Sequence, residues 1–134
     1  MNEIIIFEAE SQQVEVRLQG ETLWVAQTQM AELFATSTDN ISLHLKNIYQ
    51  EAELNEQATT EDFSVVRQEG KRQVNRQLKH YNLDAIISVG YRVNSSQATR
   101  FRQWATRVLR AHLTQGYSLN EHRLAQQGFK SHLS

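Results

Sequence analysis

The stretch QMAELFATSTDNISLHLKNIY, residues 29–49, predicts two short helices joined by a four-residue turn. Ser37 or Thr38 is suited to cap the second helix, because a hydroxyl oxygen at that position accepts a hydrogen bond from a nearby backbone N–H. This outline is that of a helix-turn-helix, although an ordinary helical hairpin in a small core would show the same pattern. Both helices carry apolar residues about one turn apart, namely Met30, Leu33 and Phe34 and then Ile41, Leu45 and Ile48.

The second helix of a DNA-reading helix-turn-helix lies in the major groove. Asparagine pairs with adenine through two hydrogen bonds, and serine, threonine and lysine reach base edges or phosphates. On this basis the candidate base-contacting residues are Thr38, Asn40, Ser42, Lys46 and Asn47. A single lysine supplies too little charge for affinity, so a separate anchor for the DNA is required.

Charge is distributed unevenly along the 134 residues, although the formal net charge is only −1. Residues 1–66 hold two cations and twelve carboxylates, a balance of −10, whereas residues 67–110 hold ten cations and two carboxylates, a balance of +8. Such a chain either presents a basic surface to a polyanion or has two halves that attract each other. Both possibilities can hold together.

Runs of β-branched and alternating residues predict strands on both sides of the helix pair. Residues 3–10 and 12–19 form a predicted hairpin, residues 20–25 a third strand, and residues 62–81 a second hairpin that turns at Glu69-Gly70-Lys71. A hairpin after a helix-turn-helix is the arrangement of a winged helix. The phosphate-contacting candidates on it are Lys71, Arg72, Arg76 and Lys79. The alternative is a solvated hairpin whose cations pair with the acidic first half.

Two further helices are predicted after this hairpin. Asn82 is placed to cap the first, and the second spans residues 95–116, with an apolar stripe opposite an arginine face. Arg100 and Arg107 on that face are further candidates for phosphate contact. The face is otherwise a protein-binding surface, or simply the solvated side of an amphipathic helix. Two smaller predictions are an ion pair between Arg102 and Asp84 and a last short helix opened by SLNE, residues 118–121.

Little in the sequence indicates catalysis or a bound cofactor. The chain has no cysteine, and its five histidines occur singly, without the spacing of metal ligands. There is no glycine-rich phosphate loop, no nucleophile elbow, and no apolar run of the roughly 18 residues that a membrane helix needs. We therefore expect a cytoplasmic protein that is not an enzyme and has no cofactor, metal or membrane association.

Together these patterns predict an α+β protein with an N-terminal β-hairpin, a winged helix-turn-helix and C-terminal helices. Residues 1–80 would hold the hairpin and the winged helix-turn-helix, and residues 81–134 would pack on them in one unit. The expected function is sequence-specific binding of double-stranded DNA by a homodimer, because one such module buries little DNA surface. The rival is a protein-interaction module, antirepressor or antitoxin-like, whose basic face binds an acidic partner.

Four segments resemble the RhuM family of bacterial virulence-associated proteins: WVAQTQMAELF (24–34), ISLHLKNIY (41–49), YNLDAIISVGYRVNS (81–95) and FRQWATRVLRAHLTQGY (101–117). The likeness runs from about Asn2 to about Asn120. It implies DNA binding and a transcriptional role in a mobile or virulence-associated locus. A fainter likeness of Tyr81–Tyr117 to the DNA-binding domain of BRO and KilA-type antirepressors implies that Arg92, Asn94, Arg100 and Trp104 matter.

Three departures from the family pattern stand out. The first helix usually opens with serine or threonine, where this chain has Ala26, so a cap worth about 1 kcal/mol is lost unless Thr28 takes over one turn later. The turn usually carries glycine, where this chain has Ala35. Family members are also usually longer, so we expect either an excised N-terminal part or a naturally shortened gene.

Overall fold

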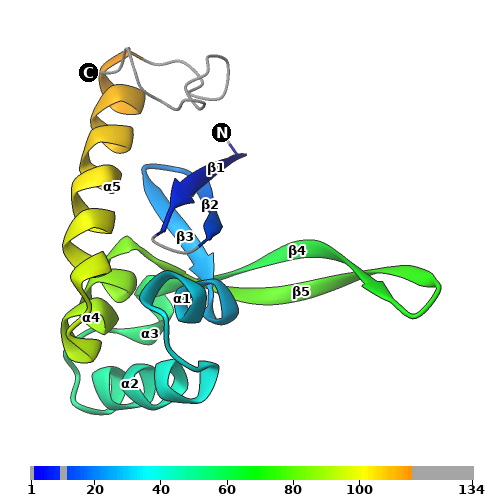
Figure 1. Ribbon diagram of the computed structural model, residues 1–134, viewed down its shortest axis with the longest axis horizontal. Coiled ribbons are helices and arrows are strands. Elements are labelled where there is room, and N and C mark those ends of the chain that lie inside the picture. Colours follow the sequence, from blue (N-terminus) through cyan, green and yellow to red (C-terminus); the bar gives the residue numbers. More distant parts are fainter. Residues whose placement is uncertain (1, 10–11, 116–134) are drawn as a thin grey trace.

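Five antiparallel strands form a single sheet in the order β1-β2-β3-β5-β4 in the computed structural model, which describes residues 2–9 and 12–115 (Figure 1). Two of the connections are two-residue loops that begin with Gly20 (φ 66°) and Gly70 (φ 64°). A positive φ at this position suits a tight hairpin turn and favours glycine. The strands are β1 (Asn2–Glu8), β2 (Gln13–Gln19), β3 (Thr22–Ala26), β4 (Thr60–Glu69) and β5 (Arg72–Asn82).

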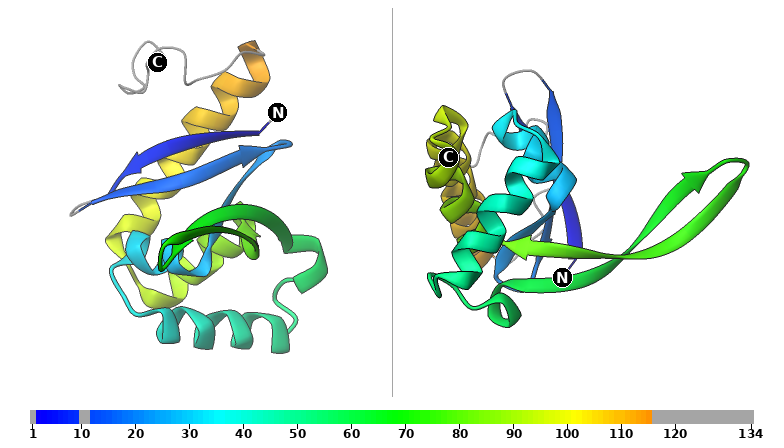
Figure 2. Two further views of the ribbon diagram at one scale, coloured as in Figure 1. Left: turned by 90° about the vertical axis from the view of Figure 1, so that its right-hand side faces the viewer. Right: turned by 90° about the horizontal axis from the view of Figure 1, so that it is seen from below.

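Helices cover one face of this sheet and leave the other face open. The helices are α1 (Gln27–Phe34), α2 (Thr38–Gln50), α3 (Glu56–Thr59), α4 (Leu83–Val93) and α5 (Ser96–Gln115). Helices α1 and α4 pack on the strands, α5 reaches β1 through aromatic side chains, and α2 packs on α1 and α4 outside this layer (Figures 1 and 2). The predicted α+β class, both hairpins and the four longer helices are therefore confirmed.

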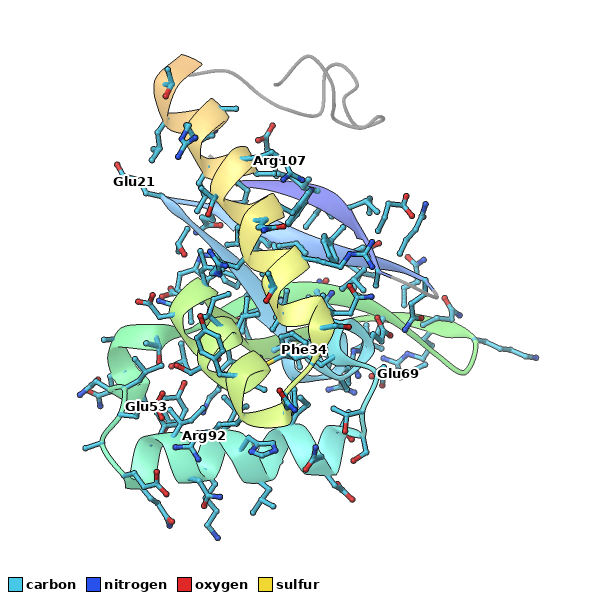
Figure 3. The ribbon with its side chains drawn as sticks, turned by 60° about the vertical axis from the view of Figure 1, so that its left-hand side comes forward. Glu21, Phe34, Glu53, Glu69, Arg92 and Arg107 are labelled. Atoms are coloured by element: carbon cyan, nitrogen blue, oxygen red, sulfur yellow. The ribbon has the colours of Figure 1, made fainter. Side chains whose placement is uncertain are left out.

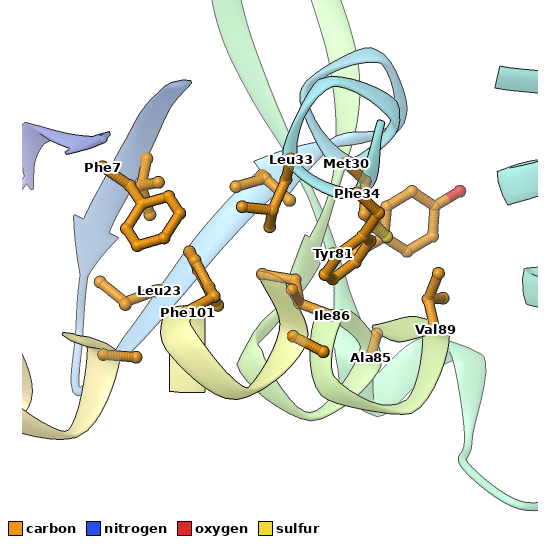
Figure 4. Packing of buried hydrophobic residues seen from close by; sticks show 14 of the residues in the cluster. Phe7, Leu23, Met30, Leu33, Phe34, Tyr81, Ala85, Ile86, Val89 and Phe101 are labelled. Carbon is orange, nitrogen blue, oxygen red and sulfur yellow. The ribbon is translucent and has the colours of Figure 1, made fainter. Parts of the chain in front are cut away.

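The core lies between the sheet and the three covering helices. Val14, Val16 and Leu18 alternate along β2 and are fully buried, as a strand with one covered face requires. Phe7 of β1 meets Phe101 of α5 edge to face, with ring centroids 5.2 Å apart (Figure 4). Burial of these apolar side chains is the main favourable contribution to folding.

The N-terminal strands belong to the same sheet as the second hairpin. Strand β3 pairs with the end of β5, with Trp24 opposite Asn82 and Ala26 opposite His80. The expected boundary between residues 80 and 81 falls inside β5, and one cluster of buried residues includes both segments. The first 80 residues and the helices after them thus share a core.

Two local features differ from the sequence expectation or fall outside it. The polar connector after α2 contains the short helix α3, which Asn55 caps by accepting a hydrogen bond from the Ala58 backbone N–H. The short helix predicted to begin with SLNE (residues 118–121) and to run to about Gln127 lies outside the described residues. In the described part of the chain, no helix is long and apolar enough to cross a membrane.

Candidate nucleic-acid interface

A three-residue turn joins α1 to α2 and fixes the angle between them. It is one residue shorter than predicted, because Ser37 rather than Thr38 caps α2 by accepting a hydrogen bond from the Asn40 N–H at 3.0 Å. Ala35 ends α1 in the left-handed conformation, with φ 55°. A residue with a Cβ is strained there, which explains why glycine would be the easier choice.

The start of α1 is capped in a different way from the one expected. The helix begins at Gln27, directly after Ala26, and Thr28 is exposed without forming a cap. Instead, the Gln29 side-chain oxygen accepts a hydrogen bond of 2.8 Å from the Ala26 backbone N–H. This is one half of a capping box, and it requires no hydroxyl at the cap position.

The candidate base-contacting residues of α2 are not equally accessible. Thr38, Ser42 and Lys46 are exposed, whereas Asn40 and Asn47 are half-buried. The Asn40 side-chain amide donates a 3.0 Å hydrogen bond to the Thr36 hydroxyl. This bond uses one of the two N–H groups of the amide and leaves the other N–H and the oxygen for a base. Because Asn40 and Asn47 are half-buried, the outward surface of α2 offers fewer accessible polar groups than the sequence suggested.

Strands β4 and β5 extend past the rest of the sheet as a two-stranded arm (Figures 1 and 2). Only the last three residues of β5 pair with β3, so the ribbon from about residue 64 to residue 77, here called the arm, has no third strand beside it. Lys71 and Arg72 at its tip are exposed, and neither makes an ion pair with any described residue.

The other two phosphate candidates on this hairpin do have intramolecular partners. Arg76 donates two hydrogen bonds to Glu69, at 2.7 and 2.9 Å, and these bonds lower the pKa of the Glu69 carboxyl. Lys79 donates a 2.9 Å hydrogen bond to Glu56 of α3, which raises the pKa of Lys79. All four side chains are substantially exposed, and such surface pairs exchange readily for other partners.

An aromatic cluster that sequence reasoning missed holds the root of the arm. Phe63 of β4 meets Trp24 and His80 edge to face, with ring centroids 5.6 and 5.0 Å apart, and the Arg17 guanidinium lies 4.6 Å from the Phe63 ring centroid. Burial lowers the pKa of His80 below its ordinary value. The signal in the sequence is weak, because these residues come from β2, β3, β4 and β5 and meet only through long-range strand pairing.

The arginines of α5 lie on another side of the molecule. Arg100, Arg107 and Arg110 are exposed, and α5 runs along the side opposite to that from which the arm projects (Figures 1 and 3). The two sets of cations therefore do not form one continuous surface. The predicted pair between Arg102 and Asp84 is wrong: both residues are exposed, and no ion pair joins them in the described chain.

Helix α2 is uncovered on the side toward which the arm points. Seen from that side, α2 lies below the arm with no other element in front of it (Figure 2). Among the described residues, no group of three or more His, Asp or Glu side chains could hold a metal ion. The candidate residues for nucleic-acid contact therefore lie on the α2 surface, on the arm and on α5.

Comparison with known protein families gives one match. Residues 58–133, more than half of the chain, match the virulence protein RhuM family. The chain belongs to the RhuM family. Comparison with curated proteins and with solved structures gave no match. The RhuM match begins in α3, so it includes the arm and the last two helices but not the helix pair at residues 29–49.

Several residues of the RhuM-matched segment have structural roles around α4. Asn82 caps α4 by accepting a hydrogen bond from the Ala85 N–H, and Asn94 ends it in the left-handed conformation. Arg92 donates hydrogen bonds to Glu51 (2.7 Å) and Glu53 (2.8 Å), just after α2 (Figure 3). The bond from Arg92 lowers the pKa of Glu53. These side chains fasten α4 to its neighbours and to the end of α2.

Proposed function

We propose that this chain is a sequence-specific DNA-binding protein that regulates transcription of a mobile or virulence-associated locus. The observation that carries the proposal is the helix pair α1–α2 beside a protruding arm with excess positive charge. Residues 66–77 of the arm hold four cations and one carboxylate, a balance of +3. In this proposal the helix pair and the arm act as a winged helix-turn-helix, with β3 beside β5 and the arm as the wing.

Helix α2 would enter the major groove and contact base edges. Thr38, Ser42 and Lys46 are the exposed groups for this role. The half-buried Asn47 and Asn40 would add to them, Asn40 with the amide groups that its bond to Thr36 does not use. The first turn of α2 also carries the exposed Asp39, which repels phosphate. Because of this carboxylate, affinity has to come from elsewhere.

The arm would supply that affinity through phosphate contacts. Lys71 and Arg72, with Arg67 beside them on β4, are exposed and make no ion pair in the described chain. Arg76 and Lys79 would join them after exchanging Glu69 and Glu56 for phosphate oxygens. Phosphate contacts position a protein on DNA without specifying sequence, so this division of roles matches the charge distribution. A homodimer would place two such modules on paired half-sites.

A salt titration of binding to mixed-sequence duplex DNA tests the proposal. Lys71, Arg72 and Arg67, joined by Arg76 and Lys79, would make about five phosphate contacts, so log affinity against log salt should fall with a slope of about −4.5 per chain. Replacing Lys71 and Arg72 by alanine should reduce the steepness by about 1.8. Unchanged mobility of the wild-type protein with DNA at low salt would refute the proposal.

The matched control replaces two arginines elsewhere. Arg100→Ala with Arg107→Ala removes the same charge from α5, on the side away from the arm. The slope should stay at the wild-type value in this variant. Equal losses of slope in both double variants would mean that total charge, rather than the arm, determines the affinity.

The second candidate function is a protein-interaction module, antirepressor or antitoxin-like. The observation that favours it is the row of exposed α5 arginines, which make no ion pairs in the described chain and lie apart from the arm. An acidic protein surface would complement this row. If the wild-type chain fails to bind DNA at low salt, the α5 surface becomes the leading candidate for the functional site.

A further inference from the structure

The two sides of the arm carry different chemistry. Side chains of directly opposed residues in an antiparallel pair share one side, and successive residues alternate. One side, here called the arginine side, holds three of the arm's cations. It consists of the pairs Val65–Arg76, Arg67–Val74 and Glu69–Arg72. The other, here called the amide side, has no charged residue and consists of Ser64–Gln77, Val66–Asn75 and Gln68–Gln73.

Every residue of the amide side is exposed, and Val66 is 64% exposed. Two of its amides are used within the arm: Gln77 donates to the Ser64 hydroxyl (2.8 Å) and Gln68 to the Gly70 carbonyl (3.0 Å). The side chains of Gln73 and Asn75 make no hydrogen bond with any described residue. These two amides lie on β5 with one residue between them, so they point to the same side.

This arrangement fits the floor of a DNA major groove. The major groove admits a two-stranded β-ribbon, and glutamine or asparagine there pairs with adenine through two hydrogen bonds. An apolar side chain such as Val66 complements the thymine methyl group of the same kind of base pair. The long arginine side chains of the opposite side can reach past the ribbon edges toward the phosphates. The amide side would thus face the bases, while the arginines of the other side extend toward the phosphates.

We propose that the amide side of the arm is a second base-reading surface, which enters the major groove and selects A·T base pairs through Gln73 and Asn75. This inference rests on the proposed DNA-binding function and deepens it. It assigns to the arm a part of the specificity that the sequence pattern gave to α2 alone. The arm would thereby supply base contacts in addition to the few accessible polar groups of α2.

The test compares the DNA sequences that variants select from a random duplex library. The Gln73→Ala, Asn75→Ala double variant should lose preference for A·T at one or two positions, by about fivefold or more at each, since a bidentate contact discriminates by about that much or more. Its salt slope should equal the wild-type slope, because no charge is removed. The matched control, Gln103→Ala on the exposed surface of α5, should select the wild-type sequence.

A near-isosteric variant sharpens the test. Asn75→Asp keeps the size of the side chain but replaces the amide donor by a carboxylate, which accepts a hydrogen bond from cytosine N4. It should shift the preference at one position from adenine to cytosine. Ser42→Ala with Lys46→Ala should change other positions of the site, because those residues belong to α2.

The outcomes separate this inference from the function on which it rests. A selected sequence that is the same for wild type, the double alanine variant and Asn75→Asp would overturn the base-reading role of the arm while leaving DNA binding intact. A wild-type chain that selects no DNA would refute the proposed function and this inference together. Circular dichroism melting curves that match the wild type establish that each variant is folded.

Discussion

Substituting alanine for Gly90 should loosen the junction of three helices. Gly90 lies in α4, and a Cβ atom there would be 2.7 Å from the Ala98 Cβ and 3.0 Å from a ring carbon of Phe34. Carbon atoms in good contact lie about 3.5–4.0 Å apart, so α4 and α5 would have to separate by about 1 Å. Such overpacking costs about 2 kcal/mol, and the better helix propensity of alanine returns about 1 kcal/mol. The net expectation is a loss of about 1 kcal/mol.

A double-mutant cycle measured by urea denaturation checks this reasoning. Ala98→Gly removes the opposing methyl group and should itself cost about 1 kcal/mol through helix propensity. In the double variant the methyl group has moved from α5 to α4 and the clash between the two Cβ atoms is gone. Its destabilisation should therefore fall about 1–2 kcal/mol below the sum of the single variants. Additivity within about 0.5 kcal/mol, or a Gly90→Ala chain more stable than wild type, would refute the close approach of α4 and α5.

Three further predictions concern other elements. Ala35→Gly should stabilise the chain by about 0.5–1 kcal/mol and raise Tm by roughly 2–5 °C, because glycine adopts the observed φ of 55° without strain; an unchanged or lower Tm would contradict this. Arg92→Ala should return the pKa of Glu53 to its ordinary range in an NMR titration and speed amide hydrogen exchange at the end of α2. If neither change is seen, the bonds from Arg92 to Glu51 and Glu53 do not hold the end of α2. Burial lowers the pKa of His80, so as pH falls the unfolded chain takes up this proton before the folded chain does. The free energy of unfolding should therefore decline below about pH 6.5, by at most about 1.4 kcal/mol per pH unit. His80→Gln should remove this decline when the free energy of unfolding is measured by urea titration above and below pH 6.5. An identical decline in the wild type and the variant would contradict the assignment to His80.

Local patterns were sufficient to predict most elements of the fold. Alternating Val14, Val16 and Leu18 indicated a strand with one covered face, and all three are buried. Asn82 was expected to cap a helix and does so. The start of α1 was harder, because Gln29 completes the cap from inside the helix and no hydroxyl or carboxylate side chain at the cap position marks where the helix begins.

The candidate site was less predictable because it depends on long-range contacts. The pairing of Lys79 with Glu56 joins residues 23 positions apart, and charge balance alone does not identify the partner. The two sides of the arm depend on one local detail, because the turn predicted at Glu69-Gly70-Lys71 is in the structure a loop of two residues, Gly70 and Lys71. The two-residue loop at Gly70 fixes which residues of β4 and β5 face each other, and the alternation of arginines and amides then follows from the sequence.

The family match includes the arm but not helix α2, so it covers only part of the surface on which the proposed function rests. The matched segment contains Gly90, Arg92 and Asn94, whose roles are close helix packing, a bridge to the end of α2 and a helix end. None of these roles requires a ligand, so they explain how a RhuM-type chain folds rather than what it binds. Helix α2 lies outside the matched residues and presents an exposed surface on this scaffold. Exposed side chains on α2 and on the arm can change without disturbing the core, so under the proposed function the same scaffold is compatible with different DNA preferences.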